Sequence, residues 1–160
     1  MVSAIALNAM PCSATAWNHA ARAVLTDYRA LAPARRNILR LMFLNPEVRA
    51  AQPQWPAVAR FVVAAFRADV ARANAEARVQ ALVDELSEAS AEFAAFWRAH
   101  EVGGFGEGTK VLRHAQAGLL QLEYSSFSVD GRSDLALVVY NPATEADAER
   151  VQALARALPR

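Results

Sequence analysis

The spacing of apolar residues changes partway along this chain, and that change constrains the fold more than any other feature. From about residue 33 to residue 102, apolar side chains recur every three or four positions, as on amphipathic helices. Four glycines between residues 103 and 108 then interrupt helix formation, and the spacing from residue 109 onward becomes that of strands. The chain is therefore expected to combine a helical middle with a β-rich C-terminal part.

The expected elements fit one α+β domain over residues 1–160. Asn18, Ser90 and Thr144 suit helix N-caps, and Asp130-Gly131 suits a hairpin turn. The expected strands are residues 3–9, 14–17, 109–114, 119–129 and 135–140. Two N-terminal and three C-terminal strands can form one antiparallel five-stranded sheet with helices packed on one face, in the order β-β-α, several helices, β-β-β, α.

Composition excludes several classes of protein. An apolar fraction of 54% with a net charge of +1 indicates a folded domain, and the arginines form no dense basic face for nucleic acid. No apolar run approaches the ~20 residues that cross a membrane. Cys12 is the only cysteine and the N-terminus lacks a basic leader, so we expect a cytoplasmic protein with no membrane partner.

Motifs for catalysis, metals and nucleotides are weak. A phosphate loop needs a strand before its glycines and a helix after them, which is the reverse of the order expected around residues 103–108. His19, His100 and His114 lack cysteine or carboxylate partners at metal-ligand spacing. No Ser-His-Asp pattern is visible. We therefore expect no enzyme, no metal and no cofactor.

One aromatic stripe is open to two interpretations. Phe93, Phe96, Trp97 and His100 are spaced i, i+3, i+4 and i+7, so they share one face of a helix. The stripe is either packed core or the wall of a cavity in which His100 is a polar group. Sites for small ligands are mostly apolar with a few polar groups, which keeps the second interpretation open.

Several segments resemble a known family. ATAWNHAARAVL (14–25) is similar to the opening of PAS domains, and LVVY (137–140) matches a final strand. Four longer segments resemble the ligand-binding domain of MmyB-like transcription regulators: RRNILRLMFLNPEVRA (35–50), AQPQWPAVARFVVAAFRAD (51–69), ELSEASAEFAAFWRAHEV (85–102) and GTKVLRHAQAGLLQLEYSSF (108–127). Asn45 stands where this family usually has Asp.

The resemblance implies a PAS-like sensor that binds an apolar small molecule such as a fatty acid. Such regulators normally carry an N-terminal helix-turn-helix domain of the XRE type, which we expect to be absent from this chain, so no direct DNA contact is expected. A homodimer is a further possible partner state of such a sensor. One alternative is a purely structural dimerisation domain without a ligand. Another is an enzyme with an uncommon site.

The expected cavity lies between sheet and helices. His100 is the first candidate to anchor an acidic ligand, followed by Arg36 and Arg113, although His100 is equally compatible with a neutral buried histidine bonded to a backbone carbonyl. The expected lining comprises some of Trp17, Ile38, Met42, Phe43, Phe61, Phe93, Phe96, Trp97, Leu122 and Tyr124.

Overall fold

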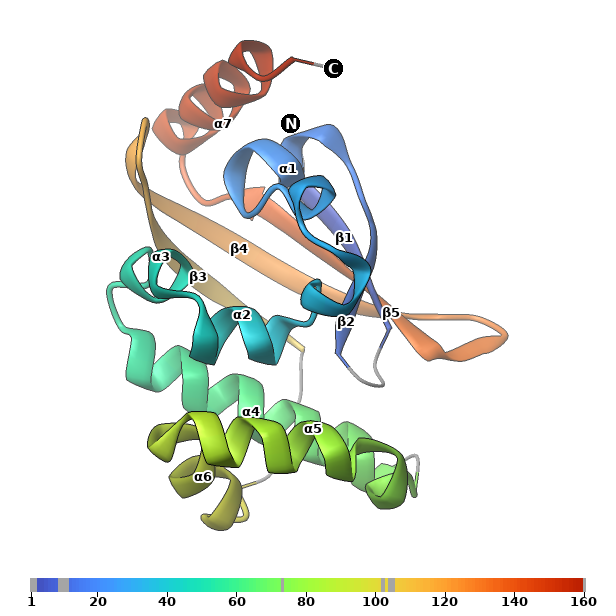
Figure 1. Ribbon diagram of the computed structural model, residues 1–160. Coiled ribbons are helices and arrows are strands. Elements are labelled where there is room, and N and C mark those ends of the chain that lie inside the picture. The colour runs from blue at the N-terminus through green and yellow to red at the C-terminus, as the bar shows by residue number, and fades with distance from the viewer. Residues whose placement is uncertain (1–2, 9–11, 73, 102, 104–105, 160) are drawn as a thin grey trace.

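A computed structural model describes residues 3–8, 12–72, 74–101, 103 and 106–159 (Figure 1). Its elements are β1 (Ser3–Asn8), β2 (Ser13–Trp17), α1 (His19–Val24), η1 (Tyr28–Ala30), η2 (Pro33–Arg35), α2 (Ile38–Leu44), α3 (Pro46–Ala50), α4 (Trp55–Arg72), α5 (Glu76–Ala89), α6 (Ala91–Arg98), β3 (Glu107–His114), β4 (Gly118–Val129), β5 (Arg132–Pro142) and α7 (Glu145–Ala157). This order confirms the α+β prediction. Part of the glycine group, residues 104–105, lies outside the described residues.

The five strands form one antiparallel sheet in the order β2-β1-β5-β4-β3. β1 pairs with both β2 and β5, and Ile5 lies opposite Trp17 on one side and Val138 on the other. The N-terminal strands therefore join the C-terminal strands in one sheet, as predicted. Because β1 and β5 are neighbours, residues from both ends of the chain share the inner face of the sheet.

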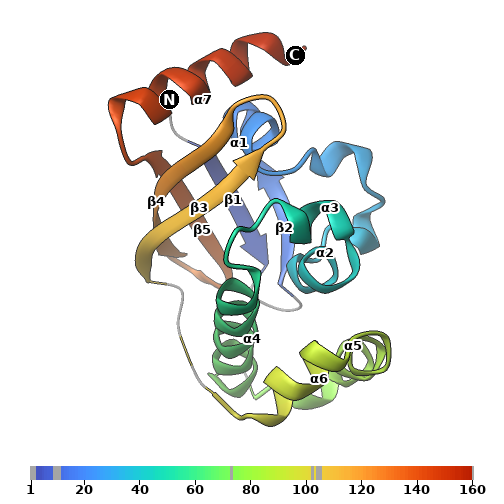
Figure 2. The same cartoon turned by 90° about the vertical axis from the view of Figure 1, so that its left-hand side faces the viewer.

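Alternation along the strands separates two faces. Ile5, Val138 and Leu122 are buried on the inner face. Phe127 and Leu137 are paired across β4 and β5, and their side chains remain 53% and 36% exposed. In Figures 1 and 2, α1 and α7 lie at one end of the sheet, whereas α4, α5 and α6 lie at the other.

Helix starts follow from short polar side chains. The Asn18 side chain accepts a hydrogen bond from the backbone of Ala21, and the Ser90 and Thr144 side chains cap α6 and α7 in the same way. These caps confirm the three predicted N-caps. Asn45 is the residue at which α2 ends, and its side chain also caps α3.

Two regions have separate cores. The helical lobe, defined here as α4, α5 and α6, encloses side chains such as Phe66, Leu86 and Phe93, which are fully buried. The sheet region, defined as the five strands with α1, η1, η2, α3 and α7, has its own apolar clusters. Helix α2 contributes to both, because Phe43 packs in the lobe and Leu41 packs against the sheet. In the described part of the chain, no helix combines the length and hydrophobicity that spanning a membrane requires.

Candidate functional site

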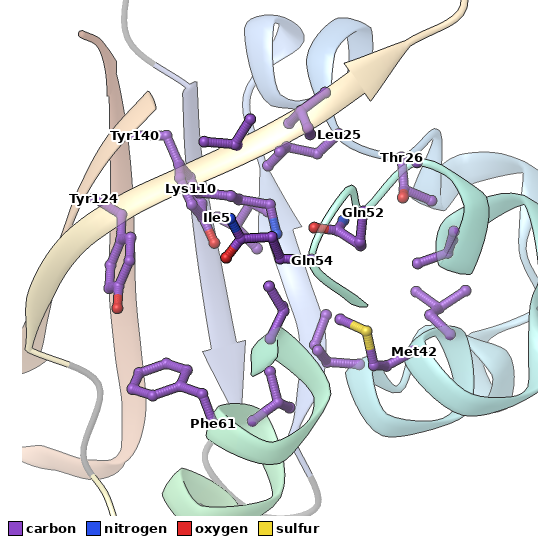
Figure 3. Close-up of a pocket in the computed structure, with 18 of the residues that line it drawn as sticks. Ile5, Leu25, Thr26, Met42, Gln52, Gln54, Phe61, Lys110, Tyr124 and Tyr140 are labelled. Atoms are coloured by element: carbon purple, nitrogen blue, oxygen red, sulfur yellow. The ribbon is translucent and has the colours of Figure 1, made fainter. Parts of the chain in front are cut away.

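A cavity of about 420 Å³ lies between the inner face of the sheet and helices α2 to α4 (Figure 3). This volume falls within the range of about 300–1,000 Å³ that small-ligand sites occupy. Strand residues, helix residues and the segment between α3 and α4 all contribute walls. The cavity, called the sheet pocket below, is lined by Ile5, Leu7, Leu25, Thr26, Tyr28, Ile38, Leu41, Met42, Val48, Ala51, Gln52, Gln54, Ala57, Val58, Phe61, Val62, Thr109, Lys110, Val111, Leu112, Tyr124 and Tyr140.

Strand register brings two tyrosines into the wall. Tyr124 on β4 lies opposite Tyr140 on β5 and Gly108 on β3, and the two tyrosine rings are 6.1 Å apart between centroids. A Cβ atom on Gly108 would lie only 2.9 Å from the Tyr124 hydroxyl oxygen. Glycine at position 108 therefore leaves the space in which the Tyr124 ring lies.

Helices supply much of the apolar surface. Ile38 and Met42 come from α2, one helical turn apart, and Phe61 comes from α4. The Phe61 ring centroid is 6.4 Å from that of Tyr124, so α4 and β4 meet at this end of the pocket. In Figure 3, Phe61 and Tyr124 lie together on one side of the pocket and Met42 lies on the other. A ligand in the pocket would contact the sheet and two helices at once.

Lys110 is the only charged residue among the described residues that line the pocket. It projects from β3, and its Nζ atom lies 5.9 Å from the centroid of the Tyr140 ring. Burial disfavours the ammonium form and lowers the pKa of Lys110 from its usual 10.5 to about 8. No acidic side chain among the described residues offsets this effect, so the cation lies in apolar surroundings without a counter-charge.

Gln52 adds a buried amide to the pocket. It lies between α3 and α4 and is buried, with 8% of the residue exposed. Its backbone N–H donates to the Arg49 carbonyl oxygen over 3.1 Å, but its side-chain Oε1 atom has no hydrogen-bond partner among the described residues. In Figure 3, the polar ends of Gln52, Gln54 and Lys110 gather in the middle of the pocket.

The pocket tyrosines stay neutral at ordinary pH. Burial raises the pKa values of Tyr28, Tyr124 and Tyr140 above the usual range of a phenol. Tyr28 also forms a side-chain hydrogen bond with Thr26. These hydroxyls can therefore donate or accept hydrogen bonds, but they carry no charge that would compete for Lys110.

The structure brings four of the expected lining residues to the sheet pocket, namely Ile38, Met42, Phe61 and Tyr124. Leu122 faces the same side of the sheet but packs with α1 and α7 instead. Trp17 packs against Tyr28 and lies beneath the Arg36 guanidinium, whose carbon is 5.2 Å from the Trp17 ring centroid. Trp17 and Arg36 stack on each other outside the pocket lining.

The aromatic stripe lies in the core of the helical lobe, away from the sheet pocket. Phe93 is fully buried and stacks on Trp97, with 6.0 Å between ring centroids. Phe43 meets Phe93 edge-on at 5.2 Å and also contacts Phe96. The Arg67 guanidinium covers Trp97 and donates to its carbonyl oxygen. These rings fill space among α2, α4 and α6.

Two expected polar anchors point elsewhere. Helix α6 ends at Arg98, and His100 adopts a positive φ of 55°, so its exposed imidazole does not continue the stripe. Its Nδ1 atom is within hydrogen-bonding distance of the Arg98 carbonyl oxygen. Arg113 is exposed on β3, offset by one residue from the inward-facing Leu112. Neither side chain reaches the sheet pocket.

Sequence reasoning missed Lys110 and Gln52. A signal for Lys110 was present, because strict alternation places residue 110 on the same face as the apolar Leu112. A lysine at an inward position between a turn and an apolar strand is unusual. Gln52 carries no comparable signal, since it lies in a connection whose path the sequence pattern does not predict.

Within the described ranges, no group of three or more His, Cys, Asp or Glu side chains could hold a metal ion. Cys12 is buried, and burial raises the pKa of its thiol to about 12, so it remains protonated.

The fold and the pocket define a PAS-like ligand-binding domain. The family model described as the MmyB-like transcription regulator ligand binding domain matches residues 8–154. The chain belongs to this family. A search of curated proteins finds no match.

Proposed function

We propose that this regulator domain senses an amphipathic carboxylic acid, such as a medium-chain fatty acid, in the sheet pocket. The observation that carries the proposal is Lys110, a cation without a counter-charge in an apolar cavity. A carboxylate at its Nζ atom would supply that counter-charge. The hydrocarbon chain would extend along the apolar side chains contributed by α2 and α4.

The energetics favour this arrangement. Burying ~100 Å² of a hydrocarbon chain contributes about 2.5 kcal/mol before the costs of association. Hydrogen bonds that involve a charged group are stronger than neutral ones, particularly where water is excluded. Carboxylate binding would also raise the pKa of Lys110 again, so the amine would remain fully charged in the complex.

The proposed signal is a shift between two conformations of the domain. A ligand transmits a signal only if its affinity differs between two conformations. Phe61 and Met42 belong to helices that also pack in the helical lobe, and Lys110 belongs to the sheet. A ligand that contacts all three would favour one arrangement of lobe and sheet. In this proposal the domain acts in the cytoplasm and converts no substrate.

One observation favours the alternative of a dimerisation domain. Phe127 and Leu137 form an exposed apolar pair on the outer face of the sheet. A second copy of the chain could cover this pair without any ligand in the pocket. Sedimentation of the wild type and of Phe127→Ser would test this function, since a dimer held by this face would dissociate in the variant.

Matched ligands test the sensor proposal. We expect wild-type protein to bind decanoic acid roughly 10- to 100-fold more tightly than 1-decanol in calorimetry, as a charged hydrogen bond implies. Lys110→Met should abolish this preference while retaining affinity for the alcohol. Arg113→Met is the matched control, because it removes a cation from the same strand outside the pocket. Equal affinity of the wild type for acid and alcohol would contradict the proposal.

A further inference from the structure

The amide oxygen of Gln52 is the polar group of the sheet pocket that Lys110 does not explain. It is buried and has no hydrogen-bond partner among the described residues. Buried acceptors without a partner are rare in folded proteins, because the lost contact with water is not replaced. Such a group in a cavity wall can accept a hydrogen bond from a molecule that enters the cavity.

Three other polar side chains of the pocket are engaged or reach water. Thr26 and Tyr28 form a side-chain hydrogen bond with each other. Gln54 is exposed, so its amide can be hydrated when the pocket is empty. Gln52 differs from these three residues, since it is more than nine-tenths buried, its amide oxygen has no partner among the described residues, and it faces the same space as Lys110.

A plain carboxylate does not suit the amide oxygen of Gln52. A carboxylate oxygen only accepts hydrogen bonds, and so does the amide oxygen of Gln52. The two would repel each other in a cavity of low polarity. The carboxylate therefore belongs at Lys110, and a group that pairs with the amide oxygen of Gln52 must be a donor.

We infer that the ligand carries a hydrogen-bond donor, a hydroxyl or an amide N–H, a few bonds from its carboxylate, and that Gln52 accepts this hydrogen bond while Lys110 binds the acid. This inference rests on the proposed function and narrows its ligand class. Two kinds of molecule satisfy it, namely 3-hydroxy fatty acids and N-acyl amino acids. Both kinds of molecule combine an apolar chain with a carboxylate and a hydrogen-bond donor at the same end.

Calorimetry with three probes tests the inference. The probes are decanoic acid, 3-hydroxydecanoic acid and N-decanoylglycine. We expect wild-type protein to prefer at least one donor-bearing acid over decanoic acid by roughly threefold to tenfold, as one added neutral hydrogen bond implies. Which of the two is preferred identifies the donor as a hydroxyl or an amide.

Two variants test whether Gln52 causes the preference for a donor-bearing acid. Gln52→Met keeps the length of the side chain but removes the acceptor, so the preference should disappear while decanoic acid binds at least as well as before. Gln54→Met is the matched control, because this exposed amide lines the same pocket. In that variant the preference should remain.

The outcomes separate this inference from the proposed function. Binding of decanoic acid without any preference for a donor-bearing acid would overturn the role of Gln52 and leave the acid sensor intact. A preference that survives in Gln52→Met would also overturn it. Failure of all three acids to bind would overturn the inference together with the proposed function.

Discussion

The helical lobe and the sheet pocket differ in how completely their side chains fill the space among them. In the lobe, the Phe93 ring contacts the Phe43 and Trp97 rings and has no exposed surface. In the sheet pocket, a lysine has no counter-charge and a glutamine oxygen has no hydrogen-bond partner among the described residues. The lobe is therefore a packed core, although the buried Nε atom of Arg67 also lacks a hydrogen-bond partner among the described residues, whereas the unpartnered groups of the sheet pocket face a cavity.

This difference separates stability from recognition. Well-packed rings stabilise a fold because filling the space leaves no cavity. Buried polar groups without partners destabilise the empty protein, and they are retained where a ligand supplies what is missing. The predictions that follow perturb one region at a time.

Phe93→Ala should produce the largest effect. Truncating a fully buried ring in the lobe should lower the free energy of unfolding by about 3–5 kcal/mol, measured by urea denaturation. The folded fraction that remains should still bind decanoic acid with near-normal affinity, since Phe93 does not line the sheet pocket. Unchanged stability together with lost binding of decanoic acid would contradict this expectation. The aromatic stripe would then belong to the ligand site and not to the packed core.

Lys110→Met should stabilise the ligand-free protein by up to about 3 kcal/mol at pH 7. The reason is that the folded pKa of Lys110, about 8, lies below its usual 10.5. The folded state therefore binds fewer protons than the unfolded state between these values, and wild-type stability should rise as the pH increases from 8 to 10.5. Urea denaturation across this range should show the rise in the wild type but not in the variant.

Gly108→Ala should disturb the pocket from the strand side. The added methyl group would contact the Tyr124 ring, so we expect a loss of stability of roughly 1–2 kcal/mol and weaker binding of decanoic acid. Gly106→Ala is the control, because a Cβ atom there would meet no other atom within 4 Å. Equal effects of the two substitutions would show that the close approach of Gly108 to the Tyr124 ring affects neither stability nor binding.

Gln52→Met should have the smallest effect on stability. Replacing an unpaired buried amide with an apolar side chain of similar length should raise the free energy of unfolding by about 1 kcal/mol in the absence of ligand. Thermal unfolding of ligand-free protein would measure this change. A clear loss of stability would mean that the amide already has a partner in the folded protein.

Local features of the fold were predictable from the sequence. Asn18, Ser90 and Thr144 cap helices as expected, because a cap depends on neighbours within three residues. The sheet was predictable for a similar reason, since alternation reports which side of a strand is buried. Both signals are contained in short windows of sequence.

The pocket was only partly predictable because it joins distant segments. Ile5, Gln52 and Lys110 come from a terminal strand, a connection and a strand more than fifty residues later. No short window of sequence shows that they meet. His100 illustrates a different failure, because its positive φ ends the helical spacing on which its predicted position depended.

Nuclear magnetic resonance of the Lys110 side chain tests the central claim most directly. Lys110 is the only lysine in the sequence, so protein labelled with ¹³C-lysine gives one side-chain signal to follow. We predict that this signal titrates with a pKa of about 8 in free protein, and that decanoic acid raises this pKa whereas 1-decanol does not. A pKa near 10.5 that neither compound changes would contradict the account, because Lys110 would then be an ordinary solvated lysine.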